Sequence, residues 1–192
     1  MLRLGASPAG ILLWGGLYLL LTAGEFLSLA AAVLMHELGH LLALAALWCR
    51  IDAVCITGTG LRIDCGCVLS PGGAALAALA GPVFGAVWAF CAGKIGFALS
   101  GELSALLTIF NMLPLSPLDG GRALYAVLTA LMGSRRARRI ARGVDAVLCA
   151  LLCAFGLYCA WQGLGLGAAA TAAWMTLYAA LSSCKNRAYG IK

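Results

Sequence analysis

The sequence has little charge. Only 10% of its 192 residues are charged, 63% are apolar, and the mean hydropathy is +0.99. A soluble domain usually has about 25% charged and about 45–50% apolar residues. This composition excludes an ordinary soluble globule, a disordered tail and a nucleic-acid-binding domain. A membrane-spanning helix takes about 20 residues, so the chain has room for several spans and for no sizeable soluble domain. We expect an all-α polytopic membrane protein, with the lipid bilayer as its surroundings and no nucleic acid partner.

Long apolar runs predict about six transmembrane helices in one integral-membrane domain over residues 1–192. The fourth run is short, and the prolines that follow it predict broken backbone packed inside protein. The first run also carries a weak signal-peptide pattern, so a five-span mature chain is the alternative. The predicted spans are Pro8–Gly24, Leu27–Trp48, Ala74–Gly93, Leu103–Leu115, Val144–Trp161 and Leu166–Ser183.

The basic residues predict how the helices are oriented. With the N-terminus in the cytoplasm, every lysine and arginine except Lys94 falls on the cytoplasmic side, as the positive-inside rule requires. Both termini are therefore predicted to be cytoplasmic, in a multi-pass protein of a bacterial cell membrane. The arginine cluster Arg135–Arg142 fits an anchor at anionic lipid, and docking of an acidic substrate is the alternative.

The segment between the second and third predicted spans is too polar to cross a membrane. Apolar residues on both sides of Thr57–Gly60 predict a small β-hairpin or re-entrant segment. The hairpin could bind an extended substrate by strand addition, or it could be a simple connector.

The nine cysteines, an odd number lying mostly in apolar runs, are expected to pack as small apolar residues rather than to form a disulfide framework. Cys65 and Cys67 form a CxC pair, which is a weak metal-binding signal.

Small residues recur at every fourth position of the third predicted span. This spacing places them on one helical face, where a neighbouring helix can approach closely. Pro82 is expected to bend the same helix, because proline lacks an N–H donor. We interpret the stripe as a packing face, formed by Gly73, Ala77, Gly81, Gly85, Ala89 and Gly93.

The two histidines of the chain lie in one pentad, His36-Glu37-Leu38-Gly39-His40. Histidines at positions i and i+4 share one face of a helix and can bind one metal ion. In this HExxH arrangement Glu37 acts as general base toward a zinc-bound water. Two histidines on a buried helix without a metal are the alternative, but ionisable groups inside a membrane are costly unless something compensates them. The pattern predicts one catalytic zinc ion.

A catalytic zinc needs a third protein ligand and an open position for water. Asp119 is the candidate, because it follows an apolar run broken by Pro114 and Pro117 and precedes two glycines. The alternative is that Asp119 caps a helix starting near Arg122. Asn111, at the start of the same stretch, is a candidate to hydrogen-bond a substrate carbonyl or an oxyanion during catalysis.

HELGH in a transmembrane segment, Ala80-Gly81-Pro82 and the Asn111–Gly120 stretch together resemble the site-2 protease family of intramembrane zinc metalloproteases. The resemblance covers a three-span catalytic core, about residues 27–121. It implies that His36, His40 and Asp119 bind zinc, that Glu37 activates water, and that Asn111 matches the family's asparagine. The plan is most similar to the branch that processes a sporulation pro-sigma factor. We expect no PDZ-like domain within the core and no CBS domain after the last predicted span.

The resemblance implies regulated intramembrane proteolysis of a membrane-associated protein substrate, cut in or near a transmembrane segment. Because regulatory domains are not expected, control would come from a partner membrane protein or from substrate supply. Two other classes are weighed against a protease. A zinc-binding membrane scaffold would not need Glu37, and a transporter using His36, Glu37 and Asp119 as a cation relay would be favoured by inverted repeats, of which the sequence shows none.

Overall fold

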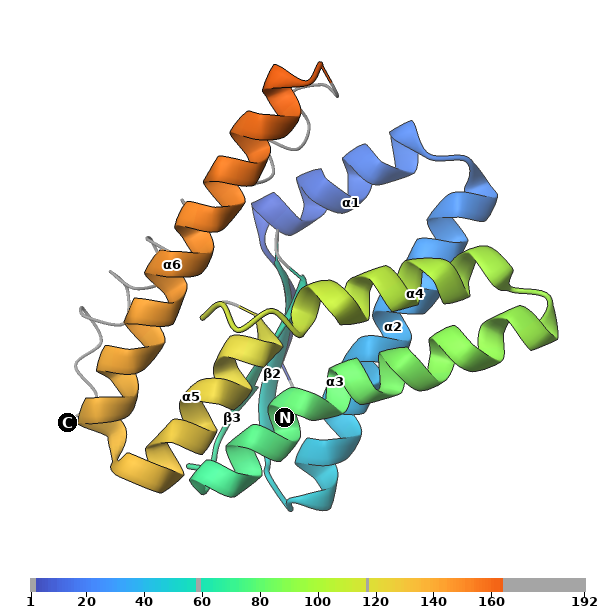
Figure 1. The fold of residues 1–192 in the computed structure, drawn as a ribbon. Helices are drawn as coiled ribbons and strands as arrows, with labels where there is room; N and C mark the ends of the chain where they lie inside the picture. Colours follow the sequence, from blue (N-terminus) through green and yellow to red (C-terminus); the bar gives the residue numbers. More distant parts are fainter. Residues whose placement is uncertain (1–2, 58–59, 117, 164–192) are drawn as a thin grey trace. The chain divides into compact units, whose positions relative to one another are not determined.

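The computed structural model describes residues 3–57, 60–116 and 118–163 (Figure 1). The chain divides into two compact units, Met1–Met112 and Leu113–Lys192, and each is described by itself. The first unit contains four α-helices and a small sheet, and the second contains two α-helices in its described part. The prediction of one domain over the whole chain stays a prediction.

The first unit begins with two consecutive helices, α1 (Pro8–Leu20) and α2 (Ala23–Ala46). Thr22 and Glu25 form a capping box at the start of α2. The Glu25 carboxylate accepts from the Thr22 N–H at 2.8 Å, and the Thr22 hydroxyl accepts from the Glu25 N–H at 3.4 Å. Reciprocal bonds of this kind satisfy N–H groups that a helix N-terminus leaves without partners. They explain why α2 starts four residues before the predicted Leu27.

Three helices of the first unit, α2, α3 (Pro71–Ala92) and α4 (Ala98–Asn111), pack against one another. The stripe of small residues on α3 lies at these contacts, as the spacing predicted, except that Gly93 falls beyond the end of α3 and has open space around it. A side chain at Gly85 would meet the Thr108 hydroxyl of α4 at 2.5 Å, and one at Gly39 of α2 would run into the Ala80 carbonyl. Between α3 and α4, Ser104 donates to the Gly85 carbonyl at 2.8 Å. The three helices can approach closely because glycine occupies these contact points.

A short 3-10 turn, η1 (Gly93–Ile95), and Gly96 connect α3 to α4. Gly96 has φ = 86°, a left-handed conformation that suits glycine. The resulting reversal places α3 and α4 side by side (Figure 1). The structure thus starts α4 at Ala98 and ends it at Asn111, whereas the predicted span ran from Leu103 to Leu115.

The predicted hairpin is present as strands β2 (Ile51–Thr57) and β3 (Gly60–Cys65), which pair antiparallel. Sequence reasoning missed a third strand, β1 (Arg3–Ala6), which pairs parallel with β2 in the order β1-β2-β3. At four residues, β1 is too short for a recognisable alternation of polar and apolar side chains. The Ser7 N–H donates to the Ile56 carbonyl at 2.8 Å, which continues the pairing into the start of α1.

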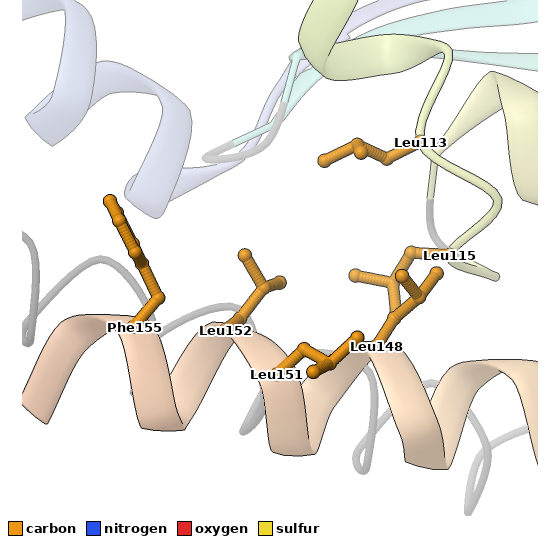
Figure 2. A pocket seen from close by; sticks show the side chains of 6 residues that line it. All are labelled: Leu113, Leu115, Leu148, Leu151, Leu152 and Phe155. Carbon is orange, nitrogen blue, oxygen red and sulfur yellow. The ribbon is translucent and has the colours of Figure 1, made fainter. Parts of the chain in front are cut away.

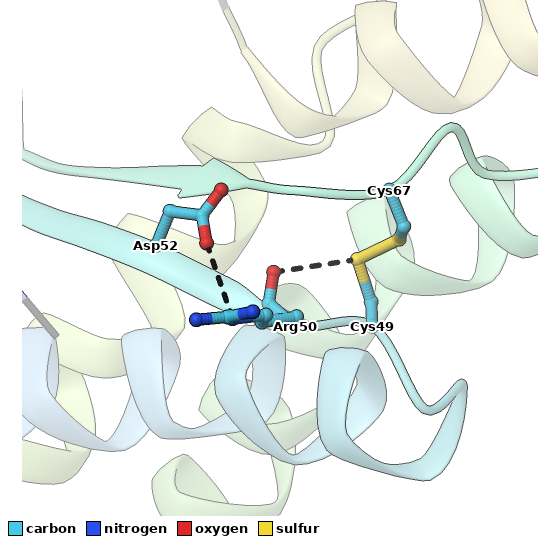
Figure 3. Close-up of polar contacts among 4 residues, drawn as sticks. All are labelled: Cys49, Arg50, Asp52 and Cys67. Carbon is cyan, nitrogen blue, oxygen red and sulfur yellow. Dashed lines mark hydrogen bonds and ion pairs between the residues drawn. A yellow bond between two sulfur atoms is a disulfide. The ribbon is translucent and has the colours of Figure 1, made fainter. Parts of the chain in front are cut away.

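Cys49 and Cys67 form a disulfide that ties the end of α2 to the chain leaving β3 (Figure 3). The expectation that the cysteines pack only as small apolar residues was therefore wrong for this pair. The two residues are 18 positions apart, and they meet because the hairpin returns the chain to its start. Cys67 is engaged with Cys49 and does not form a CxC metal site with Cys65. In the same region Arg50 pairs with Asp52 at 3.6 Å.

The second unit contains α5 (Asp119–Met132) and α6 (Ser134–Trp161). Only Gly133 separates them, with φ = 81° and ψ = 156°, a conformation that residues with a side chain rarely adopt. The sharp turn lets α5 and α6 pack against each other (Figure 1). The predicted fifth span, Val144–Trp161, is the apolar part of a helix that starts ten residues earlier, among the arginines.

Three helices of the described residues are long and apolar enough to cross a membrane: α2, α3 continued through η1, and α6. Helix α1, with 13 residues, is shorter than the predicted span it replaces, and α4, with 14 residues, is also short for a membrane span. The sixth predicted span, Leu166–Ser183, lies outside the described residues. The polytopic helical fold class is thus confirmed, together with the small sheet, while six is only an approximate count of spans.

Candidate metal centre

The two histidines of α2 face each other. Their Nε2 atoms are 3.2 Å apart, and the side chains belong to residues that are 4% and 8% exposed for His36 and His40. Two nitrogens that bind one tetrahedral zinc at about 2.0–2.1 Å lie about 3.3 Å apart. The observed separation fits that geometry. The i, i+4 spacing therefore produces the paired nitrogens that the sequence predicted.

The backbone of α3 fixes the orientation of His40. Its Nδ1–H donates to the Ala77 carbonyl at 2.8 Å, which leaves Nε2 without a proton in the neutral ring and ready to bind a metal. Metal-binding histidines usually have such a partner on the other ring nitrogen. Gly81 lies one turn further along α3, where an added side chain would run into the His40 ring. Helix α3 thus holds the ring by a hydrogen bond at Ala77 and by close contact at Gly81.

The two residues predicted to take part in catalysis also lie in the first unit. Glu37 is half-buried on α2, one residue after His36. Asn111 is the last residue of α4, and its Nδ2 donates to the Leu107 carbonyl of the same helix at 3.0 Å. The amide therefore folds back on its own helix in this structure. The roles assigned to Glu37 and Asn111 remain predictions.

Asp119 lies in the second unit and is the buried first residue of α5, 6% exposed. Leu118 occupies the N-cap position, so Asp119 lies in the first turn of α5 rather than serving as its cap. Arg122 pairs with its carboxylate at 3.5 Å. A side chain at Gly121 would collide with the Leu115 backbone, so this glycine allows the proline-containing turn to fold against α5. The helix thus breaks between Asn111 and Asp119, as the prolines predicted.

Sequence reasoning gave no role to Asp145, although it is as well buried as the predicted ligands. Asp145 lies on α6 and accepts hydrogen bonds from the backbone N–H of Ser116, at 2.8 Å, and from the Ser116 hydroxyl. Its position in the predicted fifth span, next to Val144, was the available signal, because a carboxylate in an apolar helix is costly without partners.

A helical membrane protein with an HExxH helix, and with a buried aspartate after a broken helix, has the residue pattern that predicts a metalloendopeptidase. Two imidazole nitrogens and a carboxylate oxygen form a donor set that zinc takes in hydrolytic enzymes, and His36, His40 and Asp119 supply one such atom each. The residues present therefore fit zinc.

Comparisons with known proteins show what the chain is similar to. The model of peptidase family M50 matches residues 95–155, which include α4, the proline-containing turn, α5 and most of α6. The site-2 protease from Methanocaldococcus jannaschii has a similar structure, with a TM-score of 0.68 and 21% sequence identity over 94% of this chain and 90% of that chain. Comparison with curated proteins by sequence gave no match. The chain thus has the fold of a site-2 protease, and its residues 95–155 are similar to peptidase family M50.

Proposed function

We propose that this protein is an intramembrane zinc metalloprotease that hydrolyses a peptide bond in or near a transmembrane segment of a membrane-associated protein. The observation that carries the proposal is the pair of buried Nε2 atoms of His36 and His40, 3.2 Å apart, on a helix apolar enough to span a membrane. Imidazole side chains buried inside a membrane-spanning helix bundle are energetically costly unless a bound ion compensates them. The similarity of residues 95–155 to peptidase family M50 supports the same chemistry.

His36, His40 and Asp119 would hold the zinc ion. When bound, zinc supplies Lewis acidity, which polarises a scissile carbonyl and makes water nucleophilic at neutral pH. Glu37 takes the proton of the attacking water and later delivers it to the leaving nitrogen. Its half-buried position beside His36 suits a base that must reach the reaction without binding the metal. Asn111 would hydrogen-bond the substrate once its amide leaves the Leu107 carbonyl.

The substrate would be a membrane-associated protein with a locally unwound helix, since helical hydrogen bonds hide peptide carbonyls from attack. An extended segment of this kind could pair with β3, which is an edge strand in the order β1-β2-β3. Regulation would come from a partner membrane protein or from the supply of substrate.

The distribution of basic residues supports an N-terminus and a C-terminus in the cytoplasm of a bacterial cell membrane. In that orientation the hairpin of β2 and β3, with Arg50, faces the cytoplasm. The Cys49–Cys67 disulfide is a feature more typical of oxidising compartments. The basic residues thus favour a cytoplasmic hairpin, whereas the disulfide favours a hairpin on the opposite, oxidising side of the membrane. The redox state of Cys49 and Cys67 in cells therefore reports the orientation.

Glu37→Gln tests the proposed function, because it removes the base while keeping the size of the side chain. We expect a full-length membrane protein to accumulate in cells with Glu37→Gln and to be cut in cells with the wild-type chain. Comparison of the two membrane proteomes measures this. Glu102→Gln, the same change at an exposed residue of α4, is the matched control and should behave as wild type. Equal proteomes with both proteins metal-loaded would instead favour a scaffold.

A further inference from the structure

The turn that leads into Asp119 is held from α6 by a carboxylate. Asp145 is 8% exposed, and it accepts two hydrogen bonds from Ser116, one from the backbone N–H at 2.8 Å and one from the hydroxyl. A buried carboxylate is costly unless such bonds are made. Bonds to an ionised acceptor are about twice as strong as bonds between neutral groups. Ser116 is only three residues before Asp119, so this contact fixes the backbone where the turn enters α5.

The rest of the contact between this turn and α6 is apolar and incompletely packed. A pocket of about 210 Å³ lies between the turn and the helix (Figure 2). Apolar contacts around a space of this size do not select one position of the turn as closely packed side chains would. The hydrogen bonds of Asp145 are therefore the specific restraint. The pocket is lined by Leu113, Leu115, Leu148, Leu151, Leu152 and Phe155.

We infer that Asp145 is a positioning residue for the metal centre: it sets the place of Asp119 by holding Ser116. The inference rests on the proposed function, in which Asp119 is a zinc ligand. Two features of the turn pass the restraint on to Asp119. The Leu118 N–H donates to the Leu115 carbonyl at 2.8 Å, and Gly121 lies tightly against the Leu115 backbone. Both contacts tie Leu115, the neighbour of Ser116, to the residues on either side of Asp119.

The test is the zinc affinity of the purified full-length protein in detergent, measured by competition with a chromophoric chelator. We expect Asp145→Ala to weaken zinc binding about tenfold, in the range seen for partners that orient metal ligands. Asp145→Asn keeps an oxygen for the Ser116 N–H and should rescue part of the loss. Ser116→Ala removes only the hydroxyl bond and should also fall between wild type and Asp145→Ala. Thr129→Val, which removes a hydroxyl bond within α5, is the matched control and should bind zinc as wild type.

Thermal unfolding of the same samples separates positioning from stability. A purely structural role would lower the unfolding temperature of Asp145→Ala while the folded protein kept its zinc affinity, and that result would overturn the inference. If Asp145→Ala does not fold, Asp145→Asn and Ser116→Ala decide the question, and wild-type affinity in both would also overturn it. A wild-type chain that binds zinc and cleaves substrate leaves the proposed function intact in either case. A wild-type chain that binds no zinc would contradict both proposals.

Discussion

The two units hold their site residues in different ways. In the first unit, His36 and His40 sit on one helix, and α3 locks them in place by close packing through glycines. In the second unit, Asp119 follows a broken helix, and the turn before it donates two hydrogen bonds from Ser116 to the Asp145 carboxylate, beside an apolar pocket. The first arrangement depends on the close approach of two helices, and the second depends on the hydrogen bonds between Ser116 and Asp145. We therefore expect substitutions to disturb the site residues of the two units in different ways.

The largest effect is expected from removing a metal ligand, and it should be the same in both units. His36→Ala, His40→Ala and Asp119→Ala should each weaken zinc binding at least about a hundredfold, beyond the loss typical of the groups that orient ligands. Metal content after dialysis against a chelator measures this. Loss of zinc from the histidine variants with full retention in Asp119→Ala would break the comparison, because Asp119 would then not be a ligand.

An intermediate effect is expected from Gly81→Ala in the first unit. The added methyl would run into the His40 ring, so either α3 or the ring must move. We expect a loss of stability of about 1–3 kcal/mol, as overpacking usually costs, and weaker zinc binding. Gly72→Ala on the same helix is the matched control, because a side chain there meets nothing within 4 Å. Unfolding curves and chelator competition measure the pair. Equal behaviour of the two variants would show that close packing by α3 does not hold the histidine.

The smallest effect on the metal centre is expected from breaking the Cys49–Cys67 disulfide. Cys49→Ser should loosen the hairpin, measured by limited proteolysis, and leave zinc affinity unchanged, because the disulfide lies beyond the end of α2. Cys55→Ser, at a free cysteine of β2, is the control.

Alkylation of the Cys49 and Cys67 thiols in intact cells also tests the orientation of the protein in the membrane. Free thiols at both positions agree with a cytoplasmic hairpin, and a fully oxidised pair would reverse the proposed orientation.

The first unit's site could be predicted from the sequence because its information is local. Histidines four residues apart on one helix meet whatever surrounds them, so HELGH predicted the Nε2 pair directly. The stripe of small residues on α3 likewise predicted a packing face. The hydrogen bond from His40 to the Ala77 carbonyl could not be predicted from the sequence. The two residues are 37 positions apart, and any backbone carbonyl could have been the partner.

The hydrogen bonds between Ser116 and Asp145 in the second unit could not be predicted either, because the two residues are far apart in the sequence. The proline pattern correctly predicted a break before Asp119, but the bond between Ser116 and Asp145 joins residues 29 positions apart. The predicted fifth span already contained Asp145, but nothing in the sequence marked Ser116 as its partner. The Cys49–Cys67 disulfide escaped prediction because it depends on the register of the hairpin, which the chain composition does not specify.

The central proposal is that His36, His40 and Asp119 hold one zinc ion. X-ray absorption at the zinc edge of the purified, zinc-loaded protein tests this most directly. The account predicts nitrogen and oxygen ligands at about 2.0–2.2 Å with two imidazoles per zinc, and a changed spectrum in Asp119→Ala. Sulfur at about 2.3 Å would place the metal on cysteines instead and contradict the account.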